Sequence, residues 1–342
     1  MITTCARPWI GRWSTYTVLG LIGYVTAAIT LGILGAAIGA SLVERAISIV
    51  MPAVGFVIAV YGARAVLGAE RIVFYQAGGA AWFAAVAAAA FAGERVALVS
   101  DFAIILIAIF LAFGRIGCFH VACCHGRPAP WGVRYTREHV ALGFPSYWSS
   151  RRVFPLQLVE SAASAVLAGI CVTWVATRGV DGTATVIFVI AYAAVRAPLE
   201  LARGDSGRPY ALGLSEAQWI ALITAAIATV VRPSIITVVV SCVLAAFCAV
   251  VAARNRSLVR RLRRPRHLDE IARILRSPAA SETSVALKVS VHPLPNDRLD
   301  VVWSHPSLSA SGARMLACDL FESFELVPGT TSGLYHVITA SR

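Results

Sequence analysis

Long apolar stretches alternate with short polar turns along the first three quarters of the chain. A helix needs about 20 apolar residues to cross a bilayer, and the first group of stretches meets or approaches that length. They are Tyr16–Ala40, Ala46–Gly68, Ile72–Ala92, Val96–Cys118, Val153–Ala176, Thr183–Ala202 and Glu216–Val231. A further stretch, Ser234–Ala253, follows after only Arg232 and Pro233, which form either a tight reversal or a kink. The pattern predicts an all-α multi-pass transmembrane protein with seven spans, or with eight if the chain reverses there.

The pattern changes at Arg254. The segment Arg254–Arg266 holds seven Arg in thirteen residues, and beyond it short apolar runs alternate with turn residues. The expected elements are a helix at His267–Arg276, strands at Val285–Val291 and Arg298–Trp303, a helix at Ser311–Glu325 and a strand at Gly333–Thr339. This part of the chain predicts a small soluble α+β domain.

The composition agrees with a membrane location. Hydrophobic residues make up 58% of the chain and charged residues 14%, whereas soluble proteins carry about 25% charged residues. So few polar side chains cannot cover the surface of a water-soluble particle of this size. Cytosolic globular proteins, nucleic-acid-binding proteins and disordered chains are therefore excluded. We divide the chain into a transmembrane domain (1–253), an Arg-rich linker (254–266) and a soluble domain of unassigned role (267–342).

The formal net charge of +12 identifies a class of partner. A basic membrane protein attracts anionic lipid, because Arg side chains near the surface are drawn to negatively charged headgroups. The eight Cys are too few for a disulfide scaffold in a chain of 342 residues.

Two loops are long enough to hold chemistry. The first, Phe119–Arg152, lies between the fourth and fifth predicted spans, and the second, Arg203–Leu214, follows the sixth. An even number of spans separates them, so they lie on the same side of the membrane whatever the orientation. We expect the two loops to build one site.

Ionisable residues inside spans are costly and usually mark function. Arg115 lies in the sequence Gly114-Arg-Ile-Gly117, where the glycines allow a headgroup or another backbone to approach closely. A guanidinium group binds phosphate through two parallel hydrogen bonds. Arg115 and Arg196, if they face one cavity, would form a phosphate clamp.

A second group of polar residues could support that clamp. Arg196 and Glu200 are four residues apart on one helix face, and Arg203 follows about one turn later. This row is either a self-neutralising structural group or a cationic site, because it keeps a net positive charge. Glu160 lies one turn after Gln157 and could pair with one of these Arg residues.

A cluster of soft ligands begins the first loop. Cys118, His120, Cys123, Cys124 and His125 fall within eight residues. Ligands so crowded in sequence cannot easily surround one ion, so we expect no metal. A disulfide between two of these thiols, or a thiol nucleophile with His120 or His125 as its base, stays open.

Several motifs in a fixed order resemble one family. They are Gly114-Arg-Ile-Gly-Cys-Phe, Cys-Cys-His-Gly126-Arg-Pro, Trp131-Gly-Val, Phe154-Pro-Leu-Gln-Leu-Val-Glu160, Arg196-Ala-Pro-Leu-Glu-Leu-Ala-Arg-Gly-Asp205 and Gly213-Leu-Ser-Glu-Ala-Gln-Trp219. In this order they resemble the prolipoprotein diacylglyceryl transferases, in the variant with a Gly-Arg-x-Gly-Cys signature and a Cys-Cys-x-Gly loop. The resemblance covers the chain from the first span to about residue 231.

The resemblance implies a multi-pass transferase of the bacterial plasma membrane that acts in lipoprotein biosynthesis. Such an enzyme moves the diacylglyceryl group of phosphatidylglycerol to the thiol of the lipobox Cys of a prolipoprotein and releases glycerol phosphate. The family implies no metal and no organic cofactor. Its partners are phosphatidylglycerol, the lipobox region of the prolipoprotein signal peptide and the bilayer, with no nucleic acid.

Residue by residue, the resemblance carries three catalytic positions to this chain. Arg115 matches the Arg of the glycine signature that binds phosphatidylglycerol, Arg196 the essential Arg of the later span, and Glu160 the Glu that closes the Pro-x-Gln-Leu motif. Around them, the expected substrate-binding residues are Gly114, Gly117, Gly126, Gln157, Glu200 and Arg203, together with Arg115 itself.

Four positions depart from the family pattern. The His that usually precedes Gly-Gly in the third span is replaced by Gln76 or Ala77. Cys118 and Cys123 stand where the family has Asn and an acidic residue, and Phe154 stands where His often precedes Pro. The base that activates the acceptor thiol is therefore unassigned. Two rival functions follow: a related lipid-modifying enzyme with another acceptor, and a non-catalytic phospholipid-binding module whose tail recruits a partner.

The family orientation predicts that both loops face the extracytoplasmic side. The Arg254–Arg266 cluster adjoins a soluble domain, which we expect in the cytoplasm by the positive-inside rule. An extracytoplasmic N-terminus and a cytoplasmic tail together require an odd number of spans.

Overall fold

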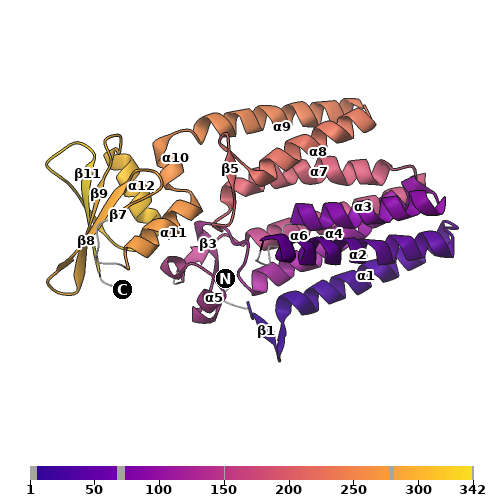
Figure 1. Cartoon of the computed structure of the whole chain (residues 1–342), viewed down its shortest axis with the longest axis horizontal. Coiled ribbons are helices and arrows are strands. Elements are labelled where there is room, and N and C mark those ends of the chain that lie inside the picture. The colour runs from indigo at the N-terminus through magenta and orange to yellow at the C-terminus, as the bar shows by residue number, and fades with distance from the viewer. Residues whose placement is uncertain (1–5, 68–73, 150, 277–280, 341–342) are drawn as a thin grey trace.

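Eight long helices form a bundle in the part of the chain that the computed structural model describes (Figure 1). The described residues are 6–67, 74–149, 151–276 and 281–340. The helices are α1 (Thr15–Ala37), α2 (Leu42–Leu67), α3 (Phe74–Ala92), α4 (Val96–His120), α6 (Leu156–Arg178), α7 (Thr183–Leu199), α8 (Glu216–Val231) and α9 (Ile235–Arg254). They match the predicted apolar stretches to within a few residues.

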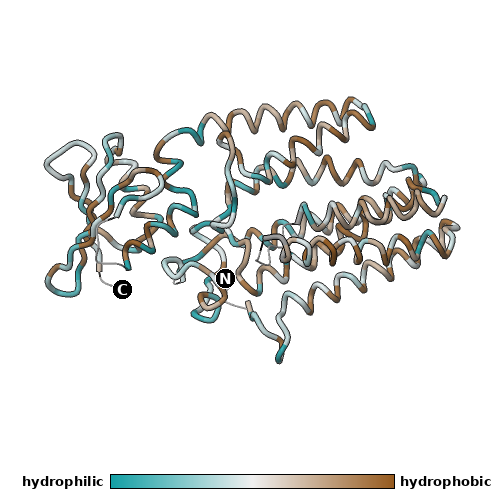
Figure 2. Tube along the Cα trace, viewed as in Figure 1, coloured by the Kyte–Doolittle hydropathy of each residue, from teal (hydrophilic) through white to brown (hydrophobic). Residues whose placement is uncertain are grey.

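Six of the described helices are long and apolar enough to cross a membrane. These are α1, α2, α4, α6, α7 extended to Ala202, and α9. Helix α8 is apolar but has only 16 residues. Hydrophobic residues dominate the bundle in Figure 2, whereas hydrophilic residues lie at its two ends, mostly at the end that adjoins the C-terminal unit. The helical multi-pass architecture is therefore confirmed, and the count of seven or eight spans stays a prediction.

Helix α4 forms the centre of the bundle. Of its most apolar 18-residue window, 72% is buried, against 28% for α1 and 17% for α2. Small residues allow close packing around it, as predicted for helices in lipid. At Gly23 of α1, for example, a Cβ atom would lie 2.7 Å from the Phe113 Cβ atom of α4. The helices that surround α4 expose apolar side chains to the outside, as a bilayer requires.

The short Arg232–Ser234 connection is a reversal, not a kink. Helix α8 ends at Val231 and α9 begins at Ile235. The Thr229 hydroxyl contacts the Thr237 carbonyl, and the Ser241 hydroxyl donates to the Ala225 carbonyl. Thr229, near the end of α8, thus lies beside Thr237, near the start of α9, and the earlier Ala225 lies beside the later Ser241. The two helices are therefore antiparallel.

Short elements fill the loops at one end of the bundle. They are the hairpin β1 (Trp9–Ile10) and β2 (Trp13–Ser14), the pair β3 (Pro128–Arg134) and β4 (Arg152–Val153), α5 (Arg137–Ala141), η1 (Ser146–Trp148), η2 (Glu200–Ala202), and the pair β5 (Tyr210–Ala211) and β6 (Leu214–Ser215). This end therefore holds both predicted functional loops.

The C-terminal part is a small α+β unit built on a five-stranded antiparallel sheet of order β10-β11-β9-β8-β7. Its elements are α10 (Leu258–Leu262), α11 (Pro265–Ile274), β7 (Ser281–Glu282), β8 (Lys288–Leu294), β9 (Arg298–Ser304), α12 (Ala310–Leu320), β10 (Glu325–Pro328) and β11 (Leu334–Ala340). The segment 254–266 contains α10 and the start of α11, and its role as a linker stays a prediction. One prediction was wrong in detail. The helix expected to reach Glu325 ends at Leu320, because the chain extends there and pairs with β11.

This unit packs on the same end of the bundle as the first loop. The Trp148 indole Nε1 donates to the Asp319 carbonyl at 2.8 Å. The Tyr147 hydroxyl donates to Asp269 Oδ1 at 2.6 Å. One hydrophobic cluster contains Tyr135 and Trp148 from the loop together with Trp303 from the sheet. The prediction that these loops and the tail lie on opposite sides of the membrane is therefore wrong, since the two share one folded core.

Candidate active site

A buried ion cluster joins three helices at this end of the bundle. Arg115 Nη2 on α4 lies 2.9 Å from Glu160 Oε1 on α6, and Arg196 Nε on α7 lies 3.5 Å from the same oxygen. All three side chains are at most 7% exposed. The Tyr192 hydroxyl also donates to this oxygen at 2.7 Å. The three predicted catalytic residues thus meet at one carboxylate.

A second layer of charges extends from that carboxylate toward the second loop. Arg196 Nη2 contacts Glu200 Oε2 at 2.6 Å, and Arg203 Nε contacts Asp205 Oδ1 at 2.7 Å. Arg208 Nε lies 3.7 Å from Glu200 and 3.5 Å from Asp205. Burial alone would raise the pKa of Asp205, but the Arg203 guanidinium group more than offsets this and holds that pKa below its ordinary value. Asp205 is therefore ionised at neutral pH.

Cations outnumber anions in this network. Four guanidinium groups (Arg115, Arg196, Arg203 and Arg208) face three carboxylates (Glu160, Glu200 and Asp205), which leaves one positive charge.

Several guanidinium N–H groups also lack an acceptor. Within the described residues, Nη1 of Arg196 and both Nη atoms of Arg203 are buried without a hydrogen-bond partner. A buried donor left unsatisfied costs about 1–3 kcal/mol, and more when it is charged. These N–H groups are therefore available to an acceptor that enters the site.

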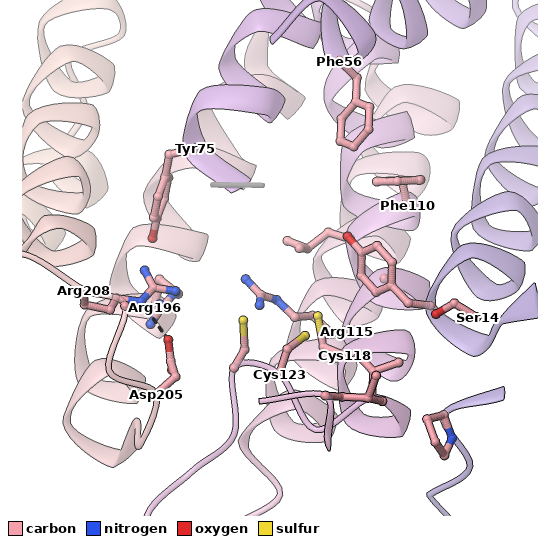
Figure 3. A pocket seen from close by; sticks show the side chains of 18 of the residues that line it. Ser14, Phe56, Tyr75, Phe110, Arg115, Cys118, Cys123, Arg196, Asp205 and Arg208 are labelled. Atoms are coloured by element: carbon pink, nitrogen blue, oxygen red, sulfur yellow. Dashed lines mark ion pairs between the residues drawn. The ribbon is translucent and has the colours of Figure 1, made fainter. Parts of the chain in front are cut away.

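A cavity of about 530 Å³ opens beside this network. Arg115, Arg196, Asp205 and Arg208 line it (Figure 3). In that view the thiols of Cys118 and Cys123 lie beside Arg115, whereas Asp205 and Arg208 lie beyond Arg196. Phe56 and Phe110 also line the cavity, so it has one charged part and one apolar part.

Two apolar grooves adjoin this cavity. One, of about 370 Å³, is lined mainly by residues of α3, α7 and α8 and shares Tyr75 with the cavity. The other, of about 360 Å³, is lined by residues of α1, α2, α3 and α4 and shares Tyr16 and Phe110 with it. A charged cavity joined to apolar grooves fits an amphipathic ligand.

The three predicted glycines have different roles. Gly114 lines the cavity, and a Cβ atom there would meet nothing within 4 Å. At Gly117 a Cβ atom would lie 2.9 Å from Tyr16 Cα, so this glycine allows α1 to pack on α4. At Gly126 a Cβ atom would lie 2.4 Å from the Phe154 carbonyl oxygen. Only Gly114 takes the position expected of a headgroup contact.

The two loops build one site, as predicted. Gly126 and Arg203 form an isolated antiparallel bridge, and the Gly204 N–H donates to the His125 carbonyl at 2.9 Å. Arg127 Nε donates to the Arg203 carbonyl at 3.0 Å, and its Nη1 donates to the Arg263 carbonyl at 3.1 Å. Arg127 therefore connects the second loop to the C-terminal unit.

Gln157 supports the cysteine segment rather than the cavity. Its Nε2 donates to the Cys123 carbonyl at 2.8 Å and lies 3.3 Å from the Tyr135 hydroxyl. The backbone at Ala122 and Cys124 has φ values of 59° and 53°. Each left-handed residue with a Cβ costs roughly 1–2 kcal/mol, so the surrounding packing enforces this tight turn.

The turn brings three thiols together. The Sγ atoms of Cys118, Cys123 and Cys124 lie within 4.8 Å of one another, and all three residues line the cavity. Hydrogen bonds from the Cys118 and Cys123 thiols lower the pKa of Cys124, and the nearby guanidinium group of Arg203 lowers it further.

The two neighbouring histidine rings have contacts of their own. The His120 ring accepts a hydrogen bond from the Arg7 N–H at 3.0 Å. The His125 ring packs against Phe144 and Trp148, and burial lowers its pKa, which keeps the ring neutral. Neither ring belongs to the cluster of ligand atoms that the three thiols form.

Sequence reasoning missed three members of the site. Tyr192 lies four residues before Arg196, so helical spacing could have identified it. Asp205 and Arg208 belong to the predicted second loop, but their pairing depends on how that loop folds. At the third-span position, Gln76 is exposed and Ala77 is buried, and neither can act as a base.

The fold and this site define a multi-pass helical membrane protein with a buried cationic cavity at one end. The sequence model of the prolipoprotein diacylglyceryl transferases matches residues 10–232, about two thirds of the chain. The chain belongs to this family. The chain is also similar to a phosphatidylglycerol–prolipoprotein diacylglyceryl transferase of Clostridium tetani (strain Massachusetts / E88), with 31% identity over 126 residues. That alignment covers 36% of this chain and 48% of the relative, so the chain matches about half of the relative's length.

Proposed function

We propose that the protein transfers the diacylglyceryl group of phosphatidylglycerol to the Cys thiol of a prolipoprotein lipobox and releases glycerol phosphate. The observation that carries this proposal is the set of buried guanidinium N–H groups without acceptors in the described residues. They belong to Arg196, which lines the cavity, and to Arg203, which pairs with the cavity-lining Asp205. A phosphate group supplies acceptor oxygens in the geometry that Arg prefers. The name of the Clostridium relative supports the identity of the two substrates.

The shape of the site supports a phospholipid rather than a soluble phosphate. The charged part of the cavity would hold the phosphate, and the two adjoining grooves would hold the acyl chains. Aromatic side chains such as Phe110 line the passage between the two environments. An amphipathic donor would thus place its scissile carbon between the arginines and the apolar grooves.

Each site residue has a role in this proposal. Arg115 and Arg196 bind the phosphate and stabilise the charge that develops on the leaving oxygen. Glu160 holds both guanidinium groups in place, since both lie within 3.5 Å of its Oε1. Glu200 and Arg203 orient the second loop.

The glycines and Gln157 act through the backbone. Gly114 leaves room for the headgroup, Gly117 and Gly126 allow backbones to pack closely, and Gln157 holds the cysteine turn.

We further propose that the protein lies in the bacterial plasma membrane with both loops on the extracytoplasmic face. The C-terminal unit then lies on that face too, because it shares a hydrophobic cluster with the first loop. The Arg-rich segment 254–266 would contact anionic headgroups there, and it would not set the orientation.

Transfer of labelled diacylglycerol tests the function directly. The purified full chain in detergent is incubated with phosphatidylglycerol, labelled in the acyl chains, and a lipobox peptide. The wild type should label the peptide, and Arg115→Ala should not. Retained labelling by Arg115→Ala would overturn the assigned role of Arg115. Absence of labelling by the wild type, with Arg115-dependent binding of phosphatidylglycerol, would favour another acceptor or a binding role.

A further inference from the structure

Three thiols converge at the edge of the proposed donor site, and the proposed function leaves them without a role. Cys118 belongs to the last turn of α4, whereas Cys123 and Cys124 belong to the turn that follows. Their Sγ atoms lie within 4.8 Å of one another.

We propose that Cys118, Cys123 and Cys124 bind one Zn²⁺ ion, and that the acceptor thiol occupies its open fourth position. Zn²⁺ prefers sulfur and nitrogen ligands in a tetrahedral arrangement. Catalytic zinc sites have three protein ligands and leave the fourth position to water or substrate. The inference about the acceptor rests on the proposed function; the metal site itself does not.

The geometry needs little adjustment to hold the ion. With Zn–S distances of about 2.3 Å, the sulfur atoms of a tetrahedral site lie about 3.8 Å apart. The observed Sγ–Sγ distances, which are at most 4.8 Å, are close to this value. The left-handed residues Ala122 and Cys124 form the tight turn, and Gln157 fixes it through the Cys123 carbonyl. The close spacing of the three Cys residues in the sequence thus does not keep their thiols from meeting, because the chain turns sharply after α4.

The charges around the thiols fit a thiolate-rich site. Three thiolates and one Zn²⁺ ion carry a net charge of −1, and a bound acceptor thiolate makes it −2. Arg115 lines the same cavity as the three thiols, and its positive charge offsets part of this excess. The two nearby histidines are engaged elsewhere, so the described residues offer only sulfur ligands at this point.

The open side of the cluster faces the proposed phosphate site. Cys118 is buried, Cys123 is exposed and Cys124 is half-buried, and all three line the cavity that contains Arg115 and Arg196. An acceptor sulfur on the metal would therefore share this cavity with the donor lipid.

A Zn²⁺ ion at this site would activate the acceptor thiol. The acceptor thiol loses its proton to water when it binds Zn²⁺ as a thiolate. Its sulfur then attacks the glycerol carbon next to the phosphate. A new S–C bond forms as the C–O bond breaks, and the electron pair stays on the phosphate oxygen between Arg115 and Arg196. Glycerol phosphate leaves as the dianion, and no atom is oxidised or reduced.

Metal content tests the site independently of transfer. The full chain, purified in detergent without metal-affinity steps and supplied with Zn²⁺, is analysed by elemental mass spectrometry. The wild type should hold about one Zn²⁺ per chain, and Cys123→Ser and Cys124→Ser should lose it. The matched control is Cys242→Ser, an exposed thiol on α9, which should keep the ion. A wild type without zinc, zinc retained in both site variants, or a disulfide among the three thiols would overturn the proposal.

Cobalt tests the open position. Co²⁺ in place of Zn²⁺ should give a thiolate charge-transfer band that intensifies when a lipobox peptide is added. It should not intensify with the same peptide carrying Ser in place of Cys. An unchanged band would exclude the acceptor from the metal.

Transfer activity separates the two proposals. Removal of zinc by a chelator should lower transfer at least ~100-fold, the order expected when thiol activation is lost, and added Zn²⁺ should restore it. Full activity of the metal-free wild type would overturn the role of the metal. A zinc-loaded chain that binds the peptide thiol but shows no transfer from phosphatidylglycerol would refute the proposed function and support the site.

Discussion

Arg115 of α4 and Glu160 of α6 form a buried ion pair, with 2.9 Å between Nη2 and Oε1. The pair fixes the guanidinium group at the wall of the cavity. A lone buried carboxylate would be costly, but here Arg196 contacts the same oxygen from the other side. Glu160 thus fixes the positions of both guanidinium groups.

Replacing Glu160 by Gln should destabilise the protein and abolish transfer. Removing one partner of a buried ion pair costs about 3–5 kcal/mol, since the remaining charge is left uncompensated. Thermal unfolding in detergent measures the effect. As the control, Glu325→Gln removes an exposed pair with Arg298, which should cost less than about 1 kcal/mol. Equal melting temperatures for the two variants would contradict this account of Glu160.

Arg115→Lys should abolish transfer although the charge is retained. A Lys ammonium group cannot form two parallel hydrogen bonds to phosphate and carboxylate. We expect at least a ~100-fold loss of kcat/KM, as found when one donor to a developing charge is removed. Arg273→Lys, at an exposed position of α11, serves as the matched control and should keep wild-type kinetics. Wild-type activity of Arg115→Lys would show that charge alone suffices.

The positions of the helices followed from hydropathy, because the helices expose their apolar faces and few charges interrupt them. The residues of the ion cluster could also be predicted, since charges inside spans are rare. Arg208 was missed because its pairing with Glu200 and Asp205 depends on how the second loop folds. Tyr192 was missed although it lies one helical turn before Arg196. The convergence of the three thiols could not be predicted either, since it depends on left-handed backbone at Ala122 and Cys124.

The placement of the C-terminal unit depends on contacts that are remote in sequence. Trp148 donates to the Asp319 carbonyl across 171 positions, and no local pattern indicates such a pairing. The basic cluster before the unit suggested the cytoplasm, but Arg263 of that cluster pairs with Asp319 at 2.6 Å instead. Part of the positive charge of the cluster is thus neutralised by an ion pair inside the fold.

The first loop and the C-terminal unit should be labelled from the same side of the membrane. Cys318 is exposed in the C-terminal unit, and Glu138→Cys would place a thiol at an exposed position of the loop. A membrane-impermeant maleimide applied to intact spheroplasts should modify both, as identified by peptide mass spectrometry. Modification of one thiol with protection of the other would contradict the shared core.

The C-terminal unit should lose stability at acidic pH because of His267. The buried ring donates from Nδ1 to the Leu262 carbonyl at 2.7 Å and accepts at Nε2 from the Thr283 hydroxyl at 2.8 Å. Burial lowers the pKa of His267. The neutral ring therefore stabilises the fold above the unfolded-state pKa of about 6.5. This contribution is lost as the pH falls through the lower folded-state pKa.

Hydrogen exchange of residues 281–340 at pH 8 and pH 5 measures this loss. Protection should fall at pH 5 in the wild type, and the difference should shrink in His267→Gln. His292→Gln changes an exposed ring and should keep the wild-type difference. The same pH dependence in His267→Gln as in the wild type would assign the effect to other groups.

The most direct test of the central claim is the mass balance of the reaction. The wild-type chain is incubated with phosphatidylglycerol and a lipobox peptide, and the modified peptide and glycerol phosphate are both quantified by mass spectrometry. The account predicts equal amounts of S-diacylglyceryl peptide and glycerol phosphate, and neither product with Arg196→Ala. Phosphatidylglycerol that binds the wild type while the peptide stays unmodified would contradict it.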